Sequence, residues 1–502
     1  MTRAQTHPFQ VRGADPRRWW VLALLCGLQF MILLDVTVVN VALPRIQDGL
    51  GFSESGLTWV VNGYVLAAGG LLLLGGRLAD VYGRKRLLLT GVVIFAASSA
   101  VCGSAVNPAM MIAGRFAQGM AEAIAAPAAL GLIALLFTDP RERTKALGLW
   151  GGLLALGGTL GSAISGVLTG LANWRWIFFI NVPVALIVLA VLPRLVAESR
   201  MVRARDSGAR ACRAPINAGL DVPGALASTA GLICLVYGLN SAASHPWDSA
   251  SVLLPLLAGA ALLAATVVLE RRASDPLIPL SFFANRTRSV VNVATLGFTA
   301  AFTAYTFMLT LYEQHVLGWS PLRGGLSWLP LGLAIGAGIG VSTALVPRLG
   351  VKALAAIGFL GAAAGLLVTS TIGVDSTYVG GILPGMVVFG LFAGVTMPAA
   401  TNAALHGVTG QDSGLASGVQ NTMQQLGSAL GLAVLVTLAL RHAATGLQRG
   451  EPAVLAVTGG YALAFRVGAA LMVLGGILIA LLFERVDPVP RNPTVERLAA
   501  AG

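Results

Sequence analysis

Long unbroken apolar runs, such as ASVLLPLLAGAALLAATVVL at 250–269, constrain this chain more than any other feature. A helix needs about 20 mainly apolar residues to cross a hydrocarbon layer about 30 Å thick. Only 11% of the 502 residues are charged, against roughly a quarter in a soluble domain. Outer-membrane barrels instead show roughly ten-residue segments of alternating polarity. The sequence therefore predicts an all-α membrane protein.

Fourteen segments are long and apolar enough to span a bilayer. They lie near 19–44, 58–76, 87–106, 109–137, 146–171, 176–196, 221–243, 250–269, 290–313, 325–345, 353–373, 378–405, 417–440 and 456–483. If the N-terminus is inside, 25 of the 33 Lys and Arg fall in inner loops and tails, 5 in outer loops and 3 within spans. Because Lys and Arg near span ends are retained on the cytoplasmic side, we expect both termini in the cytoplasm.

An Arg-rich stretch at 197–220 has the composition of a cytoplasmic linker. It divides the chain into parts that we predict from the spacing of the spans. These are an N-terminal six-helix half (1–196), the linker (197–220), two additional helices (221–269), a second linker with the C-terminal six-helix half (270–483) and a cytoplasmic tail (484–502).

The two halves resemble each other weakly. GMAEAIAAPAA at 119–129 aligns with GLFAGVTMPAA at 390–400, and such internal similarity is typical of duplicated transporters. Arg115 and Glu122 align with apolar residues of the second segment. We therefore expect the charged chemistry in the N-terminal half only.

An acidic residue, Asp35, lies deep in the first span, in MILLDVTVVNVALP. An acid in hydrocarbon is costly unless a proton, a partner or water neutralises it, so such residues are functional by default. Burial and nearby charge act on a carboxyl group in opposite directions, which allows it to load and unload protons as its surroundings change. We expect Asp35 to bind protons. The alternative is a structural hydrogen bond to a neighbouring helix.

Span four carries the polar sequence GRFAQGMAEA. At about 100° per residue, Arg115, Gln118 and Glu122 fall on one face. An arginine inside a span must find a carboxylate, a carbonyl or water, and Asp35 and Glu122 are the deep acids available. We expect Asp35, Arg115 and Glu122 to couple protons, with Gln118 beside the substrate path. The alternative is a static ion pair that holds spans one and four together.

The loop GGRLADVYGRKR at 75–86 combines spaced glycines with one acid and four bases. Glycine permits a tight turn, and Asp80 among the bases can form a charge network at the membrane face. General retention of positive charge explains the bases, but it does not explain the spacing of Gly76, Asp80 and Gly83. We expect these residues and Arg84 to form a gating loop.

These motifs resemble a known family. GGRLADVYGRKR is similar to the signature loop of the major facilitator superfamily, and fourteen spans with LDVTVVNVALP resemble its fourteen-span drug:proton antiporter family. RFAQG at 115–119 and WRWIFFINVP at 174–183 resemble its span-four motif and its span five to six junction. The resemblance covers the whole chain. It implies a major facilitator fold, with two six-helix halves plus two extra central helices.

The resemblance also implies a function. It implies a proton-coupled antiporter that exports lipophilic drugs or antibiotics across the bacterial inner membrane by alternating access. Asp35 and Arg115 would then take part in proton coupling, and the loop 75–86 would gate the alternation. A runner-up is a proton-coupled transporter of a small polar metabolite.

Span five departs from the family pattern Gly-x-x-x-Gly-Pro-x-x-Gly-Gly. This chain reads GGTLGSAISG, with Ser162 in place of the proline and Ser165 in place of a glycine. Gly157 and Gly161 still give a small-residue face on which helices approach closely, so we expect them to form a hinge. Glu122 stands where the family usually has a small residue, which makes it a further acid for protons or cationic drugs.

Candidate substrate contacts lie in spans nine and thirteen. Phe298, Phe302 and Tyr305 recur at helical spacing and can stack on flat or cationic molecules, although ordinary packing is the commoner reason for such a stripe. Asn421 and Gln425 share one face of span thirteen and can hydrogen-bond a ligand or a neighbouring helix.

Several other classes find no support in the sequence. No CxxC pattern or histidine cluster predicts a metal, and no GxxxxGK[ST] loop predicts ATP, so we expect no cofactor. The net charge of +12 sits in short clusters between apolar runs, which favours lipid headgroups over nucleic acid. A membrane-embedded transferase is the alternative of a different class, but no HExxH or GxSxG motif supports an enzyme. We expect protons and a small lipophilic molecule as ligands, and a functional monomer.

Overall fold

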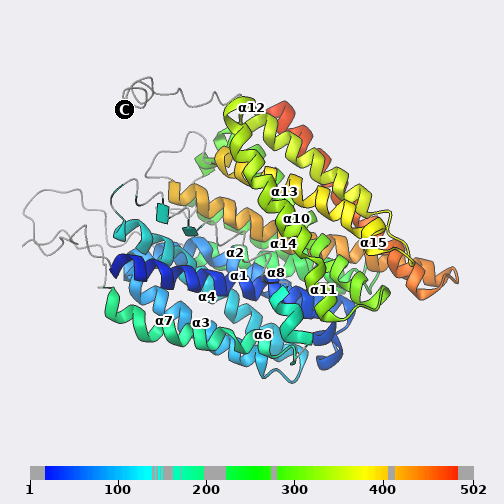
Figure 1. Ribbon diagram of the computed structural model, residues 1–502, viewed down its shortest axis with the longest axis horizontal. Helices are drawn as coiled ribbons and strands as arrows, with labels where there is room; N and C mark the ends of the chain where they lie inside the picture. The colour runs from blue at the N-terminus through cyan, green and yellow to red at the C-terminus, as the bar shows by residue number, and fades with distance from the viewer. Residues whose placement is uncertain are drawn as a thin grey trace, which may run out of the picture.

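The computed structural model describes residues 17–137, 163–170, 172–196, 222–272, 280–404 and 413–483, with 139, 142, 145, 146, 149, 150 and 161 between them. All regular elements in these ranges are helical. They include 12 stretches long and apolar enough to cross a membrane. Figure 1 shows most of these helices running side by side along the long axis of the molecule.

The N-terminal helices are α1 (Arg17–Leu50), α2 (Glu54–Tyr82), α3 (Arg84–Gly103), α4 (Pro108–Leu136), α6 (Trp176–Phe179) and α7 (Asn181–Leu195). The next two are α8 (Val222–Ser241) and α9 (Ala250–Arg272). The remaining elements are η1 (Leu280–Ala284), α10 (Arg286–Leu311), η2 (Tyr312–Val316), α11 (Pro321–Ser327), α12 (Leu329–Thr369), η3 (Tyr378–Ile382), α13 (Leu383–Ala404), α14 (Ser413–Gln448) and α15 (Ala453–Leu482). We call the end at which α1 begins and α15 ends the proximal end, and the opposite end the distal end.

Several helices extend past the apolar runs from which they were predicted, whereas α8 lies within its predicted span, 221–243. α2 covers Glu54–Tyr82, whereas the run alone predicted 58–76. Polar caps set these boundaries: Ser53 accepts a hydrogen bond from the backbone N–H of Gly56 at 3.1 Å, and Asn107 caps α4 in the same way. Capping satisfies backbone groups in polar loops, so the helix continues beyond the hydrocarbon-facing part.

The long helix α12 folds back on itself at Gly350, whose φ is 75°. Its first part packs on α13, where Ser342 donates to the carbonyl of Val395. Its second part runs antiparallel to α13, because Gly358 lies at Thr396 and Gly365 lies at Phe389. α12 therefore accounts for two of the predicted spans, 325–345 and 353–373. The predicted span 146–171 lies largely outside the described residues, so the count of fourteen stays a prediction.

Two glycines that align between the halves occupy matching places. A side chain at Gly119 of α4 would meet the carbonyl oxygen of Tyr64 at 2.2 Å, and one at Gly390 of α13 would meet that of Leu331 at 2.9 Å. Small residues allow such close approach of membrane helices. The α2–α4 contact thus has a counterpart in the contact between α12 and α13.

Matching lysines brace the proximal end of each half. Lys85, at the start of α3, donates to the carbonyls of Pro193 and Val196 at the end of α7. Lys352, just after the bend in α12, donates to the carbonyl of Phe483 at the end of α15, at 2.8 Å. Cations at helix C-termini satisfy carbonyls that the helix leaves free.

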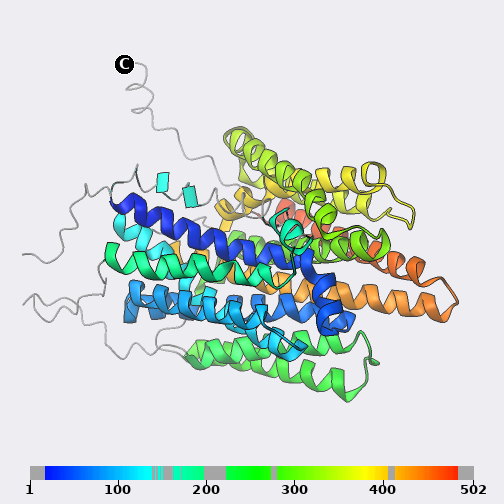
Figure 2. The ribbon, with the colours of Figure 1, turned by 60° about the horizontal axis from the view of Figure 1, so that its bottom comes forward.

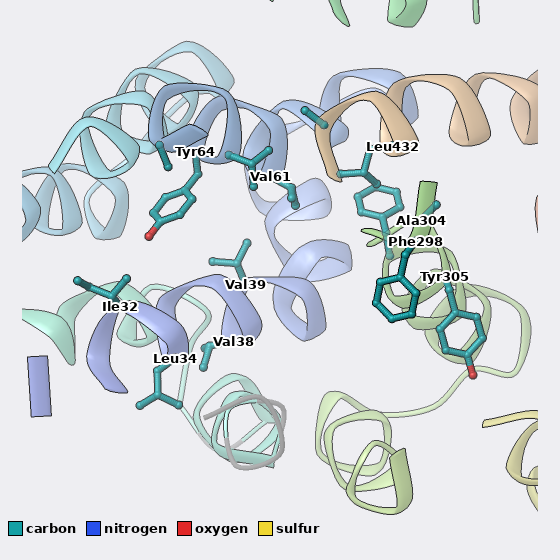
Figure 3. Close-up of a cluster of buried hydrophobic side chains, with 14 of the residues drawn as sticks. Ile32, Leu34, Val38, Val39, Val61, Tyr64, Phe298, Ala304, Tyr305 and Leu432 are labelled. Atoms are coloured by element: carbon teal, nitrogen blue, oxygen red, sulfur yellow. The ribbon is translucent and has the colours of Figure 1, made fainter. Parts of the chain in front are cut away.

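One hydrophobic core runs through both halves. Figure 3 shows part of it, with apolar side chains from α1, α2, α10 and α14. The pair α8–α9 lies along one side of the bundle (Figure 2). α8 docks between α2 and α14, since Asn240 donates to the hydroxyl of Thr58 at 3.0 Å and Thr437 donates to the carbonyl of Leu239 at 2.9 Å.

Candidate functional site

Asp35 of α1 and Arg115 of α4 form an ion pair in the interior of the N-terminal helices. Each residue is 1% exposed. Removing two charges from water is costly, and the attraction between them offsets this cost only when the remaining polar atoms also find partners. The surroundings of the pair supply those partners.

Two amide side chains complete the coordination of the Asp35 carboxylate. Gln118 donates to Oδ1 at 3.0 Å, and Asn181 donates to the same oxygen at 2.8 Å. The hydroxyl of Ser99 accepts from both amides, at 2.7 Å from Gln118 and 3.3 Å from Asn181. Three donors, Arg115, Gln118 and Asn181, therefore converge on Asp35.

The guanidinium of Arg115 is held on every side. Its Nε donates to the carbonyl of Val60 at 2.8 Å, and Nη1 donates to Oε1 of Gln118 at 2.8 Å as well as to Asp35. Its Cζ lies 4.4 Å from the ring centroid of Tyr64, in cation–π contact. The network thus joins α1, α2, α3, α4 and α7.

Asn181 lies within WRWIFFINVP and has no role among the predictions from the sequence. The signal that could have found it is a lone amide in an otherwise apolar run. α6 and α7 meet at Ile180, and Asn181 begins α7 with its side chain on Asp35, at 1% exposure. Ser99 on α3 was missed because a serine in an apolar helix is common.

Glu122 lies two turns beyond Arg115 on α4. Its Oε2 is buried with no hydrogen-bond partner among the described residues, and the hydroxyl of Tyr64 is likewise unpartnered. Tyr64, Asp35 and Arg115 are its electrostatic neighbours. Glu122 is thus a second acid close to the ion pair but outside its hydrogen bonds.

The predicted gating loop, 75–86, ties the proximal ends of neighbouring helices together. Gly83 joins α2 to α3 with a φ of 104°, a conformation that favours glycine. Arg84 donates to the carbonyl of Gly131 on α4 at 2.7 Å. Gly76 faces Pro127 of α4. Asp80 lies in the last turn of α2, and its side chain is outside the part that the structure describes.

The predicted hinge lies partly outside the described residues, because Gly157 and Ser162 fall in the gap. Gly161 packs on α1, where an added side chain would come within 1.9 Å of Oγ1 of Thr37. Ser165 donates to the carbonyl of Val38. This helix therefore contacts α1 within one turn of Asp35.

The predicted substrate contacts are dispersed. Phe298, Phe302 and Tyr305 pack among aromatic rings of the C-terminal half, with Tyr305 4.6 Å from the ring of Phe389. This arrangement favours packing over ligand stacking. Asn421 is exposed on α14, Gln425 lies against Gly69 of α2, and Gln118 belongs to the ion-pair network.

A buried acid also occurs in the C-terminal half. Glu313 of η2 is 0% exposed. The expectation that charged chemistry is confined to the N-terminal half stays a prediction. It rested on comparing span four with span twelve, and that comparison does not reach the end of span nine, where Glu313 lies.

Comparisons with known proteins show which family the chain belongs to. The family model described as Major Facilitator Superfamily matches residues 25–432. The chain belongs to this superfamily. It is 38% identical to the puromycin resistance protein of Streptomyces alboniger, covering 95% of this chain and 94% of the relative. It is 40% identical to the lincomycin resistance protein of Streptomyces lincolnensis, covering 87% of each chain.

The fold of this major facilitator protein also matches solved structures. A bacterial homologue of the lysosomal transporter Spinster, inward-facing and occupied, matches with a TM-score of 0.63 at 15% identity, covering 95% of this chain and 100% of that one. The family and the all-helical fold class predicted from the sequence are confirmed. The relatives named for antibiotic resistance and export indicate a multi-pass membrane transporter and not an enzyme.

Proposed function

We propose that this protein exports small lipophilic drugs or antibiotics across the bacterial inner membrane in exchange for protons, by alternating access. Relatives named for resistance to puromycin and lincomycin support the substrate class. One observation carries the proton part: Asp35 is a fully buried acid whose charge is balanced by a single arginine, Arg115, on another helix.

Protonation of Asp35 changes the balance of the network. A neutral carboxyl group no longer balances Arg115, which is then left as an unpaired buried charge. The donors to Asp35 come from α4 and α7, so loss of its charge weakens the hold of these helices on α1. α1 also contacts the C-terminal half, because Gln314 donates to the carbonyl of Val41 at 2.8 Å. Proton binding therefore biases how the two halves pack.

Glu122 gives Arg115 a second anionic partner within electrostatic range. When Asp35 is protonated, attraction to Glu122 reduces the cost of the unpaired guanidinium. A cationic substrate would compete for the same acid. This competition makes proton loading and substrate loading favour different states.

The distribution of cations supports an orientation of the protein in the membrane. Arg84, Lys85 and Lys352 all lie at the proximal end, where they contact helix termini. Since Lys and Arg are retained on the cytoplasmic side, the proximal end, where α1 begins and α15 ends, faces the cytoplasm. The distal end then faces the outside. There, residues 163–170 contact α11 closely, since a side chain at Gly166 would meet the carbonyl of Pro321 at 2.8 Å.

The membrane potential makes such an exchange useful. One elementary charge moved across 100 mV yields about 2.3 kcal/mol, which supports a concentration ratio of roughly fifty. One proton entering for each neutral molecule leaving is therefore enough to keep a toxic compound out.

The test is transport in proteoliposomes under an imposed pH gradient, with puromycin, lincomycin and ethidium as probes. We expect the intact protein to concentrate at least one probe. Asp35→Asn should no longer concentrate a probe against its gradient but should still exchange it downhill. Glu122→Gln should remain coupled to protons and transport the probe at a lower rate. The matched control is Asp48→Asn, an exposed acid on the same helix. Concentrative transport by Asp35→Asn would overturn the coupling, and failure to move any probe would overturn the substrate class.

A further inference from the structure

We infer that Glu313 is a second proton-binding residue, and that its protonation is required to close the distal end of the transporter. The inference rests on the proposed function, which places the distal end outside. It concerns a residue of the C-terminal half that the Asp35–Arg115 network does not contact in any described interaction.

Glu313 is more isolated than Asp35. It is 0% exposed, and its Oε2 has no hydrogen-bond partner among the described residues. That oxygen faces α11, where a side chain added at Gly324 would lie 3.7 Å away. No ion pair to Glu313 occurs in the described part of the chain, which includes α10, α11 and α15 around it. A charge here would be costly, and a proton removes that cost.

The hydrogen-bond donors near Glu313 are neutral. The hydroxyl of Ser327 donates to Oε1 of Glu313 at 2.9 Å and also lies 2.6 Å from the carbonyl oxygen of Gly324. A serine has one O–H, so this donor is shared between the two oxygens. The indole of Trp328 is a second neutral donor beside the carboxyl group. A charge on Glu313 would therefore face neutral donors and no ion-pair partner among the described residues, whereas a proton removes the cost of burying it.

The charged and titratable groups around Glu313 do not replace that proton. Arg323 of α11 is within electrostatic range, but its guanidinium stacks 4.3 Å above the ring of Trp319. Three tyrosines complete the surroundings, and none of them is a cation at neutral pH. They are Tyr305 of α10, Tyr312 of η2 and Tyr378 of η3. His315 of η2 and Tyr461 of α15 line a separate small cavity that also includes Glu54.

Glu313 sits in the segment that closes the distal end. The next residue, Gln314, donates to the carbonyl of Val41 on α1. On the other side, α11 packs on residues 163–170, with the Cβ of Leu322 3.4 Å from the Cβ position of Gly170. Moving α11 away from these contacts would separate Ser327 from Glu313 and admit water. The carboxyl group could then release its proton to the outside.

The two acids therefore act at different points of the cycle. In this distally closed state Asp35 is paired with Arg115, whereas Glu313 has no ion pair in the described part of the chain. A proton taken from the outside by Glu313 would allow the empty transporter to close. Acid outside the cell would thus speed the return of the transporter to the cytoplasmic-facing state.

The test is disulfide formation between Gly170→Cys and Leu322→Cys in a chain whose four native cysteines are replaced by serine. The Cβ separation of 3.4 Å is close to that of a disulfide, so the bond reports distal closure. The cross-linking rate is measured as a function of pH in two double-cysteine chains, one with Glu313 and one with Glu313→Gln. The ratio of the first rate to the second cancels the pH dependence of the thiols, because both chains carry the same cysteines. Gln mimics the protonated acid and can still accept from Ser327.

We expect the ratio to be near one in acid and to fall roughly tenfold per pH unit above the midpoint. Ser327→Ala removes a donor to the charged form of Glu313, so it should move the midpoint toward alkaline pH by roughly half to one pH unit. Glu451→Gln, a distal acid elsewhere, should leave the profile unchanged. A ratio that is flat with pH would overturn the inference.

The two proposals can fail separately. If Asp35→Asn uncouples transport while the cross-linking ratio is flat, only the role of Glu313 is wrong. If the ratio falls with pH as expected but Asp35→Asn still concentrates the probe, the coupling role of Asp35 is wrong and the proton-sensitive closure stands.

Discussion

Replacing Asn181 by alanine tests whether the amide donors hold α7 to α1 through Asp35. Asn181 donates to Oδ1 at 2.8 Å and is one of three donors to that carboxylate. A hydrogen bond to a charged group contributes about 1.5–3 kcal/mol, against about 0.5–1.5 kcal/mol for one between neutral groups. Loss of this donor should therefore lower the free energy of unfolding by about 1.5–3 kcal/mol and weaken proton-driven transport.

The assay is thermal unfolding in detergent, combined with the rate of proton-driven ethidium exchange in proteoliposomes. Asn240→Ala is the matched control, because Asn240 is a buried asparagine that donates to a neutral hydroxyl, that of Thr58. The control should lose about 0.5–1.5 kcal/mol of stability and keep proton-driven exchange. If Asn181→Ala is no less stable than the control and exchanges ethidium like the intact protein, the donors around Asp35 do not hold the network together.

Further predictions concern packing. Gly161→Ala should lower the melting temperature by several degrees, because the new Cβ would meet Thr37 and overpacking costs about 1–3 kcal/mol. Gly27→Ala is the control: nothing lies within 4 Å of its Cβ position, so it should leave the melting temperature unchanged. Arg441→Gln removes two hydrogen bonds from α14 to the loop after α8, so the rate of amide hydrogen exchange at 242–249 should rise roughly tenfold. Arg449 is exposed, so Arg449→Gln should leave that rate unchanged. Unchanged melting or exchange would contradict each argument.

The apolar runs predicted most of the helices because membrane spans need about 20 apolar residues and little else. Sequence also put Asp35 and Arg115 in one site, since an intramembrane arginine must find an acid. It could not choose between Asp35 and Glu122 as the partner of Arg115. That choice depends on the packing of α1 against α4, which brings Asp35 to the guanidinium.

Other residues escaped prediction for identifiable reasons. Asn181 is a single amide, and its importance appears only when α7 brings it to Asp35. Glu313 was the last residue of a predicted span, where an acid normally reaches water. The π-helical turn η2 and the following α11 fold over it and bury it. Burial of a residue by a short helix in the following loop leaves no periodic pattern in the sequence.

The paired lysines at the membrane face have a mechanical consequence. Lys85 and Lys352 each contact the end of the final helix of their own half, and no hydrogen bond in the described part of the chain joins either lysine to the other half. A rocking movement of one half against the other therefore stretches none of these bonds. Each half can therefore move as a rigid body, and the contacts that must change between the two facing states are those at the interface between the halves.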